Sequence, residues 1–137
     1  MKTLLIALFT MISTITIAQN TVTWKGGTPG KETSWNEAKN WSNNKVPNEF
    51  SNVIISDIST STFSTPIIKE GTIELNSIMI ESSAQLTVET SAKLIIYGYA
   101  EGLMKDNLQL SGSLIVLDEY AENELQNIAT TGNSKSN

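Results

Sequence analysis

The sequence predicts an all-β protein, and within that class a parallel β-helix (a β-solenoid) with an N-terminal cap. An apolar–x–apolar triplet recurs at positions 78/80, 86/88 and 94/96, eight positions apart each time, and small or polar residues separate the triplets. Such a short, regular recurrence is typical of β units that stack and bury their apolar faces on their neighbours. The Asn-Gly and Asp-Gly dipeptides that commonly form hairpin turns are absent, which favours the solenoid over an antiparallel meander. A β-sandwich is the alternative fold.

The triplets also predict which side chains face the interior, because successive residues of a strand point to opposite sides. We expect six aliphatic side chains to point inward, namely Ile78, Ile80, Leu86, Val88, Leu94 and Ile96. Ala84 and Ala92 occupy matching places before two of these pairs, where small side chains suit tight corners. Apolar and polar residues alternate on both sides of the repeat as well, so the predicted solenoid extends over residues 51–117.

Residues 1–18 have the features of a secretory signal peptide. Lys2 supplies the positive charge, a mostly apolar stretch follows, and Thr16 and Ala18 are small residues at the positions that precede cleavage. A membrane span needs roughly 20 apolar residues, whereas this stretch is shorter and contains hydroxyl groups. We therefore expect a secreted, extracellular chain with no membrane span after signal cleavage, and the outer-membrane surface is one location for it.

Composition excludes several classes of function. The chain has no cysteine and no histidine, so it can form no disulfide, no thiolate or imidazole metal site and no histidine-based catalytic triad. Its formal net charge is −5, and its few lysines do not cluster. Nucleic-acid binding needs clustered cations, so we expect no nucleic-acid partner. We also expect no cofactor and no enzymatic activity.

Residues 19–50 form the predicted cap. They contain every tryptophan of the chain, namely Trp24, Trp35 and Trp41. Residues 34–41 fit either one helical turn with Ser34 as its N-cap or a compact loop. The favoured role of the three indoles is a hydrophobic plug over the first strands, because a solenoid needs a covered end. The alternative is a platform on which sugar rings stack, and this makes the tryptophans the candidate ligand-binding residues.

The last segment, residues 118–137, is expected to form a terminal helix followed by a disordered polar tail. Its apolar residues approximate a helical stripe that consists of Tyr120, Ala121, Leu125 and Ile128.

Three glutamates, Glu74, Glu81 and Glu89, lie on or near the outward face of the repeat. Glycoside hydrolysis needs two carboxylates about 5 to 10 Å apart. A solvated acidic face is the favoured interpretation, because charged residues normally occupy outer faces. We therefore assign no catalytic residue.

Several stretches along the chain carry a resemblance to a known group of proteins. They are Thr23–Gly27, Ser34–Trp41, Lys45–Pro47, Asn52–Ile55 and the strand series Ile78–Gly98. In this order they resemble secreted Bacteroidetes surface proteins, which commonly open with Trp-x-Gly, Trp-x-x-x-x-Asn-Trp, Val-Pro and an apolar strand. The resemblance covers residues 21–117 and implies a right-handed parallel β-helix on secreted or cell-surface, adhesin-like proteins. It carries no catalytic residues.

These observations together predict a non-catalytic β-solenoid module, secreted or at the cell surface, with a structural or adhesive role. The alternative function is carbohydrate binding through the tryptophan cluster. The partner that we expect is a polysaccharide or another cell-surface component.

Overall fold

The computed structural model describes residues 20–57 and 65–118, and the remaining residues lie outside the described part. The signal peptide expected at residues 1–18 falls outside it, as do the terminal helix and tail expected at 118–137, except for Asp118. The described elements are β1 (Asn20–Thr23), the 3-10 turn η1 (Ala38–Asn40), β2 (Ser51–Ile55), β3 (Ile67–Leu75), β4 (Ser77–Ile80), β5 (Leu86–Ile96), β6 (Ala100–Glu101), β7 (Leu108–Leu110) and β8 (Ser113–Val116).

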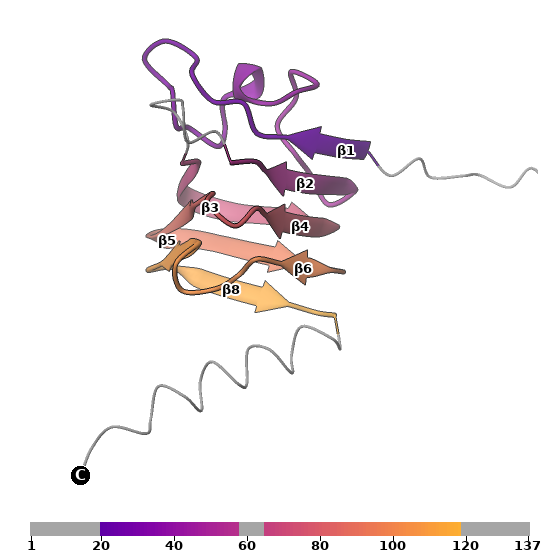
Figure 1. Ribbon diagram of the computed structural model, residues 1–137. Helices are drawn as coiled ribbons and strands as arrows, with labels where there is room; N and C mark the ends of the chain where they lie inside the picture. Colours follow the sequence, from indigo (N-terminus) through magenta and orange to yellow (C-terminus); the bar gives the residue numbers. More distant parts are fainter. Residues whose placement is uncertain (1–19, 58–64, 119–137) are drawn as a thin grey trace, which may run out of the picture.

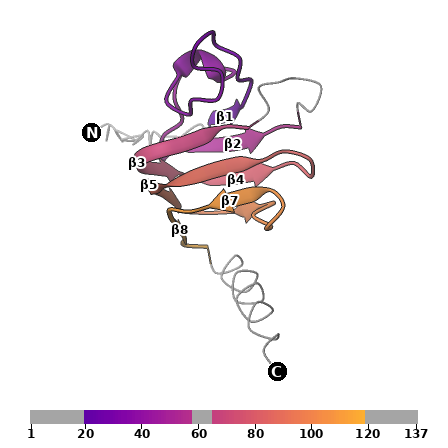
Figure 2. The ribbon, with the colours of Figure 1, turned by 90° about the vertical axis from the view of Figure 1, so that its left-hand side faces the viewer.

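The strands form two sheets, and the chain passes from one to the other as the stack grows (Figures 1 and 2). The first sheet has the order β1-β2-β4-β6, and the second has the order β3-β5-β7, with β8 also paired to β5. Every pairing between these strands is parallel. This confirms an all-β fold with parallel sheets. The hairpin meander is wrong, and the described strands do not form the antiparallel sheets of a typical β-sandwich.

The register of the sheets corrects the expected stacking of the triplets. Paired residues in the middle of the stack lie 20 to 25 positions apart, as in Val53 with Ile78 and Ile68 with Val88. The triplet at 78/80 belongs to β4 in the first sheet, whereas those at 86/88 and 94/96 belong to the two ends of β5 in the second sheet. We call one pass of the chain through both sheets a level. The three triplets therefore lie on three sides of one level and do not stack on one another. The eight-residue period measures the distance from one side of a level to the next.

A bend in the middle of β5 allows one strand to supply two of these sides. Burial alternates at both ends of the strand, but Glu89, Thr90 and Ser91 in its middle are all exposed. β7 pairs with residues 86–88 at one end of β5, and β8 pairs with residues 93–96 at the other end. The polar middle of β5 therefore marks a corner of the stack.

One hydrophobic core fills the space between the two sheets. All six side chains predicted to point inward are at most 3% exposed, namely Ile78, Ile80, Leu86, Val88, Leu94 and Ile96. Ala84 and Ala92, which were predicted to occupy tight corners, are buried as well. This part of the prediction is confirmed, and burial of apolar surface at about 25 cal/mol per Å² makes the core the main stabilising feature of the fold.

The predicted cap lies over the β1 end of the stack (Figure 1). Only residues 20–23 of the predicted cap region 19–50 belong to a sheet, where they form β1 beside β2. The rest of the segment folds over the core and is tied to the second sheet by a parallel bridge between Ser34 and Ile67. The core is thus closed at this end by a loop rather than by another strand.

Candidate functional site

The three tryptophans predicted as candidate ligand-binding residues lie together inside the cap. Trp41 is central, because its ring centroid lies 4.9 Å from that of Trp24 and 4.7 Å from that of Trp35. The interplanar angles are 76° and 72°, which is the edge-to-face arrangement that aromatic pairs favour. Each of the three side chains is at most 1% exposed. This burial favours the plug over the sugar platform, since no indole face is open to solvent.

Backbone contacts hold the indoles in place. Trp24 and Trp41 form an antiparallel bridge, and the amide of Ser42 donates to the carbonyl oxygen of Thr23 at 2.9 Å. The indole Nε1 of Trp41 donates to the carbonyl oxygen of Trp35 at 2.8 Å. The Nε1 atom of Trp35 is buried and has no hydrogen-bond partner among the described residues. The central tryptophan is therefore fixed by a hydrogen bond, and Trp35 is fixed by packing and by its backbone.

Asn40 organises the cap, and the sequence interpretation did not find it. Its side chain is fully buried. Its Nδ2 donates to the carbonyl oxygens of Lys31 at 2.7 Å and Ser34 at 3.0 Å, and its Oδ1 accepts from the amide of Thr28 at 2.9 Å. A buried amide needs such partners. The only signal in the sequence was a polar residue directly before Trp41 in an aromatic segment.

The turn inside the cap begins at Glu37 and not at Ser34. Glu37 is the N-cap of η1, and its carboxylate accepts from the amide of Lys39 at 3.4 Å. The ammonium group of Lys31 lies 3.1 Å from the same carboxylate. The hydrogen bond from Lys31 is the main cause that holds the pKa of Glu37 below its ordinary value, and the hydrogen bond from the amide of Lys39 adds to it. The helical turn with Ser34 as N-cap is therefore wrong, and the compact loop is observed.

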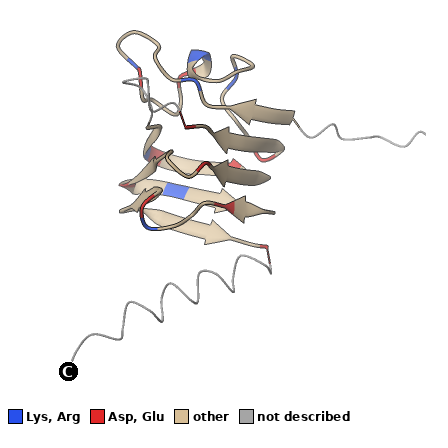
Figure 3. Ribbon diagram, in the orientation of Figure 1, with Lys and Arg blue, Asp and Glu red and all other residues tan. Residues whose placement is uncertain are grey.

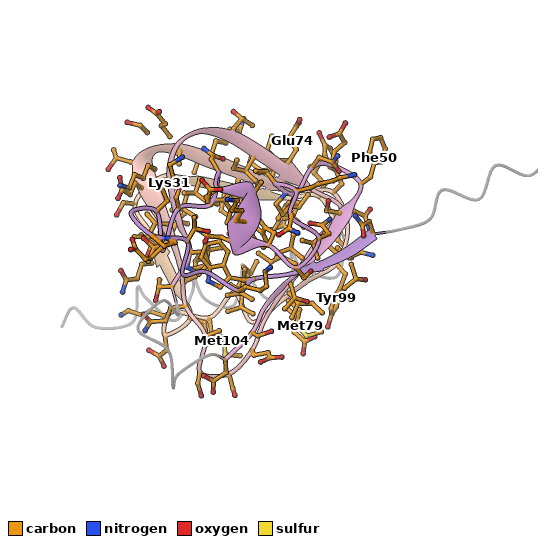
Figure 4. The ribbon with its side chains drawn as sticks, turned by 90° about the horizontal axis from the view of Figure 1, so that it is seen from above. Lys31, Phe50, Glu74, Met79, Tyr99 and Met104 are labelled. Carbon is orange, nitrogen blue, oxygen red and sulfur yellow. The ribbon has the colours of Figure 1, made fainter. Side chains whose placement is uncertain are left out.

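Three exposed aromatic side chains lie beside turns on one side of the stack, where the chain enters or leaves β2, β5 and β6. We call this set the aromatic corner, and it consists of Phe50, Tyr97 and Tyr99, which are 54%, 46% and 55% exposed. Backbone hydrogen bonds connect the levels that carry them. The amide of Asn76 donates to the carbonyl oxygen of Ser51 at 3.0 Å, and the amide of Gly98 donates to that of Asn76 at 2.8 Å. Figure 4 shows Phe50 and Tyr99 at the periphery on the same side of the molecule.

Carboxylates border the aromatic corner. The hydroxyl group of Tyr97 donates to Oε1 of Glu74 at 2.7 Å, and that of Tyr99 donates to Oε2 of Glu101 at 2.9 Å. The hydrogen bond to Glu74 raises the pKa of Tyr97, and desolvation and the negative charges of Glu74 and Glu49 act in the same direction. The corner thus combines exposed rings with oriented hydroxyl groups and hydrogen-bond acceptors. No sequence pattern pointed to it, because its members come from turns that lie on the same side only in the folded stack.

The three glutamates of the predicted acidic face have different surroundings. Glu74 binds Tyr97, and Oε2 of Glu81 accepts from the amide of Asp57 at 2.7 Å. Glu89 borders a shallow polar hollow of about 200 Å³, which is also lined by Lys69, Thr90, Ser91 and Ser111. None of these contacts pairs one carboxylate with another.

Charged residues are distributed over the cap and the strands (Figure 3). Within residues 20–57 and 65–118, no group of three or more acidic side chains is placed to hold a metal ion. No helix in the same part of the chain has the length and apolar character that crossing a membrane requires.

Comparison with known proteins places the chain in a family. A family model described as Domain of unknown function (DUF8693) matches residues 23–136. Searches of curated proteins and of solved structures gave no match. The matched range includes the tryptophan cluster and the aromatic corner, and it continues beyond β8. The chain belongs to the DUF8693 family of domains of unknown function.

Proposed function

We propose that this chain is a secreted, non-catalytic β-solenoid module with a structural or adhesive role at the cell surface. The two parallel sheets are then sides of a right-handed parallel β-helix. The observation that carries this proposal is parallel pairing at intervals of 20 to 25 residues by a chain that alternates between sheets. Parallel neighbours need a crossover connection, and such connections are right-handed in about 98% of cases. The crossover from β2 to β4 contains β3 of the second sheet.

The cap supports the same proposal. A solenoid needs covered ends, because a terminal level otherwise exposes its apolar interior. The tryptophan cluster meets this need at the β1 end, where Val22 and Val53 are at most 1% exposed.

Secretion rests on the signal-peptide features of residues 1–18 and on the resemblance to secreted Bacteroidetes surface proteins. Mass spectrometry of the exported protein should find Gln19 as its first residue. An intact N-terminus in a chain that stays in the cytoplasm would contradict this part of the proposal.

The aromatic corner is the surface to which we assign adhesion. Aromatic faces stack on sugar rings, and carboxylates accept hydrogen bonds from hydroxyl groups. Glu49, Glu74 and Glu101 at the corner, together with the net charge of −5, disfavour an anionic polymer. The expected ligand is therefore a neutral polysaccharide.

Retention on immobilised polysaccharides tests this assignment. Mannan and β-glucan are the neutral probes, and polygalacturonate is the acidic comparison. The chain should be retained on a neutral probe, and the Tyr97→Ala/Tyr99→Ala variant should lose retention. The matched Tyr97→Phe/Tyr99→Phe variant keeps both rings and should keep most of the retention. Equal retention of the alanine variant and the unmodified chain would contradict a role for the aromatic corner.

The tryptophan cluster is the alternative carbohydrate site, and it requires the cap to open. Tryptophan fluorescence separates the two sites. A blue-shifted emission that does not respond to the polysaccharide supports the plug. A red-shifted emission that changes on addition of the same polysaccharide supports binding by the tryptophans.

A further inference from the structure

The last level of the stack leaves part of the core uncovered. Ile68 pairs with Val88 and Val88 pairs with Leu110, so the three side chains form one column that faces the interior. Ile68 and Val88 are 1% and 0% exposed, but Leu110 is 45% exposed. Leu110 continues a buried column and is exposed because no described strand lies beyond it.

Two other inward side chains at this end are less buried than their register partners. Leu108 and Leu114 pair with Leu86 and Leu94, which are fully buried, yet both are only half-buried themselves. We call this surface the open end, and it consists of Leu108, Leu110 and Leu114. Apolar side chains exposed together at the end of a core commonly mark a surface that has a partner.

We propose that residues 119–128 of this same chain cover the open end. The segment begins three residues after Val116, the last residue of β8, so it starts at the surface to be covered. Its sequence offers Tyr120, Leu125 and Ile128 as apolar residues for that surface. The family match continues to residue 136, so the segment is part of the same domain. Even at the compact rise of about 1.5 Å per residue, ten residues reach about 15 Å, which is enough to cross between sheets that pack about 10 Å apart.

The strands at the open end favour this occupant over strand addition by another molecule. β6, β7 and β8 contain only two, three and four residues. Short edge strands offer few backbone groups to an added strand. The open end is therefore better suited to side-chain packing than to extension of its sheets.

Hydrogen exchange of the chain from Gln19 to Asn137 tests the proposal. The amides of Ser111 and Leu117 bond to carbonyl oxygens of β5 at 2.9 Å and report the opening of the last level. In a Leu125→Ser/Ile128→Ser variant their exchange should become at least about tenfold faster, because two apolar side chains no longer cover the leucines. Exchange at Asn76, in the middle of the stack, should not change. The matched control is Asn123→Ser/Gln126→Ser, which alters polar positions of the same segment and should exchange like the unmodified chain.

Equal exchange in all three proteins would overturn the proposal. Exchange that slows as protein concentration rises, and that is unaffected by Leu125→Ser/Ile128→Ser, would identify a second copy as the occupant and overturn it as well. A cross-link gives a readout that does not depend on stability, because the chain has no cysteine of its own. Leu110→Cys with Leu125→Cys should form a disulfide within one chain. Gln109→Cys with Leu125→Cys should not, since neighbours on a strand face opposite sides; the reverse result would contradict the proposal.

Discussion

Asn40 joins three backbone groups of the cap through the hydrogen bonds of its side chain. Asn40→Asp replaces a group that donates to two carbonyl oxygens with a carboxylate that repels them. We expect the free energy of unfolding to fall by at least about 2 kcal/mol, since a buried polar group would lose its partners. Urea unfolding measures the loss. Asn43→Asp is the matched control, because Asn43 uses only its Oδ1 to accept from the amide of Lys45, and an unchanged Asn40→Asp midpoint would contradict the assigned role.

The tryptophan cluster makes an asymmetric prediction. Trp41→Phe removes the Nε1 group that donates to the carbonyl oxygen of Trp35, whereas Trp35→Phe removes an Nε1 group without a partner among the described residues. Both changes remove a similar volume from a buried site. Trp41→Phe should therefore be the more destabilising by about 1 kcal/mol, the value of one hydrogen bond. Thermal unfolding of the two variants measures the difference, and equal losses would argue against this bond as a determinant of the cap.

Tyr97 gives a pH-dependent test of the aromatic corner. Its pKa is raised mainly by the hydrogen bond to Glu74, so this contact stabilises the fold below the ordinary tyrosine pKa and is lost as pH rises through the raised value. Glu74→Gln should lower the pKa of Tyr97, which NMR titration of labelled tyrosine rings can follow. Glu70→Gln, which alters an exposed residue of the same strand, should leave it unchanged. An unchanged pKa in Glu74→Gln would show that the contact does not persist in solution.

At the scale of elements, two levels of the stack approach each other closely at the turn between β7 and β8. A Cβ atom at Gly112 would overlap the carbonyl oxygens of Glu89 and Ala92 at the bend of β5. Gly112→Ala should lower the free energy of unfolding by about 2 kcal/mol, as overpacking typically does. Gly71→Ala is the comparison, because its Cβ would meet open space and only its φ of 81° is unfavourable. Denaturant unfolding that ranks Gly71→Ala as the more damaging would contradict the close approach.

The same elements show what the sequence could and could not predict. The inward residues were predictable because alternation along a strand is a local property, and all six are buried. The register was not, because it depends on partners 20 to 25 positions away and on the bend in β5. The three consecutive polar residues at 89–91 were the only sign of that bend. The eight-residue repeat was therefore real, but it describes the sides of a level and not the distance between levels.

At the scale of the whole molecule, the two ends of the stack differ. The β1 end is closed by residues that the sequence marked through their tryptophans, although the buried amide that holds them was not apparent. At the other end, leucines of β7 and β8 are only partly buried, although their register partners in β5 are fully buried. The aromatic corner was also not predictable, because Phe50 and Tyr97 lie far apart in the sequence and come to the same side of the molecule only through the stacking of levels.

The stacking register is the feature on which all of these statements depend, and paired cysteines test it most directly. Ile54 and Met79 are register partners of the first sheet, on its outer face. Neighbouring strands lie about 4.8 Å apart, within the range of roughly 4.4 to 6.8 Å between Cα atoms that a disulfide requires. Ile54→Cys/Met79→Cys should therefore cross-link within the folded chain, whereas Met79→Cys/Thr87→Cys, eight positions apart on different sheets, should not. Cross-linking of the second pair and not of the first would contradict the fold described here.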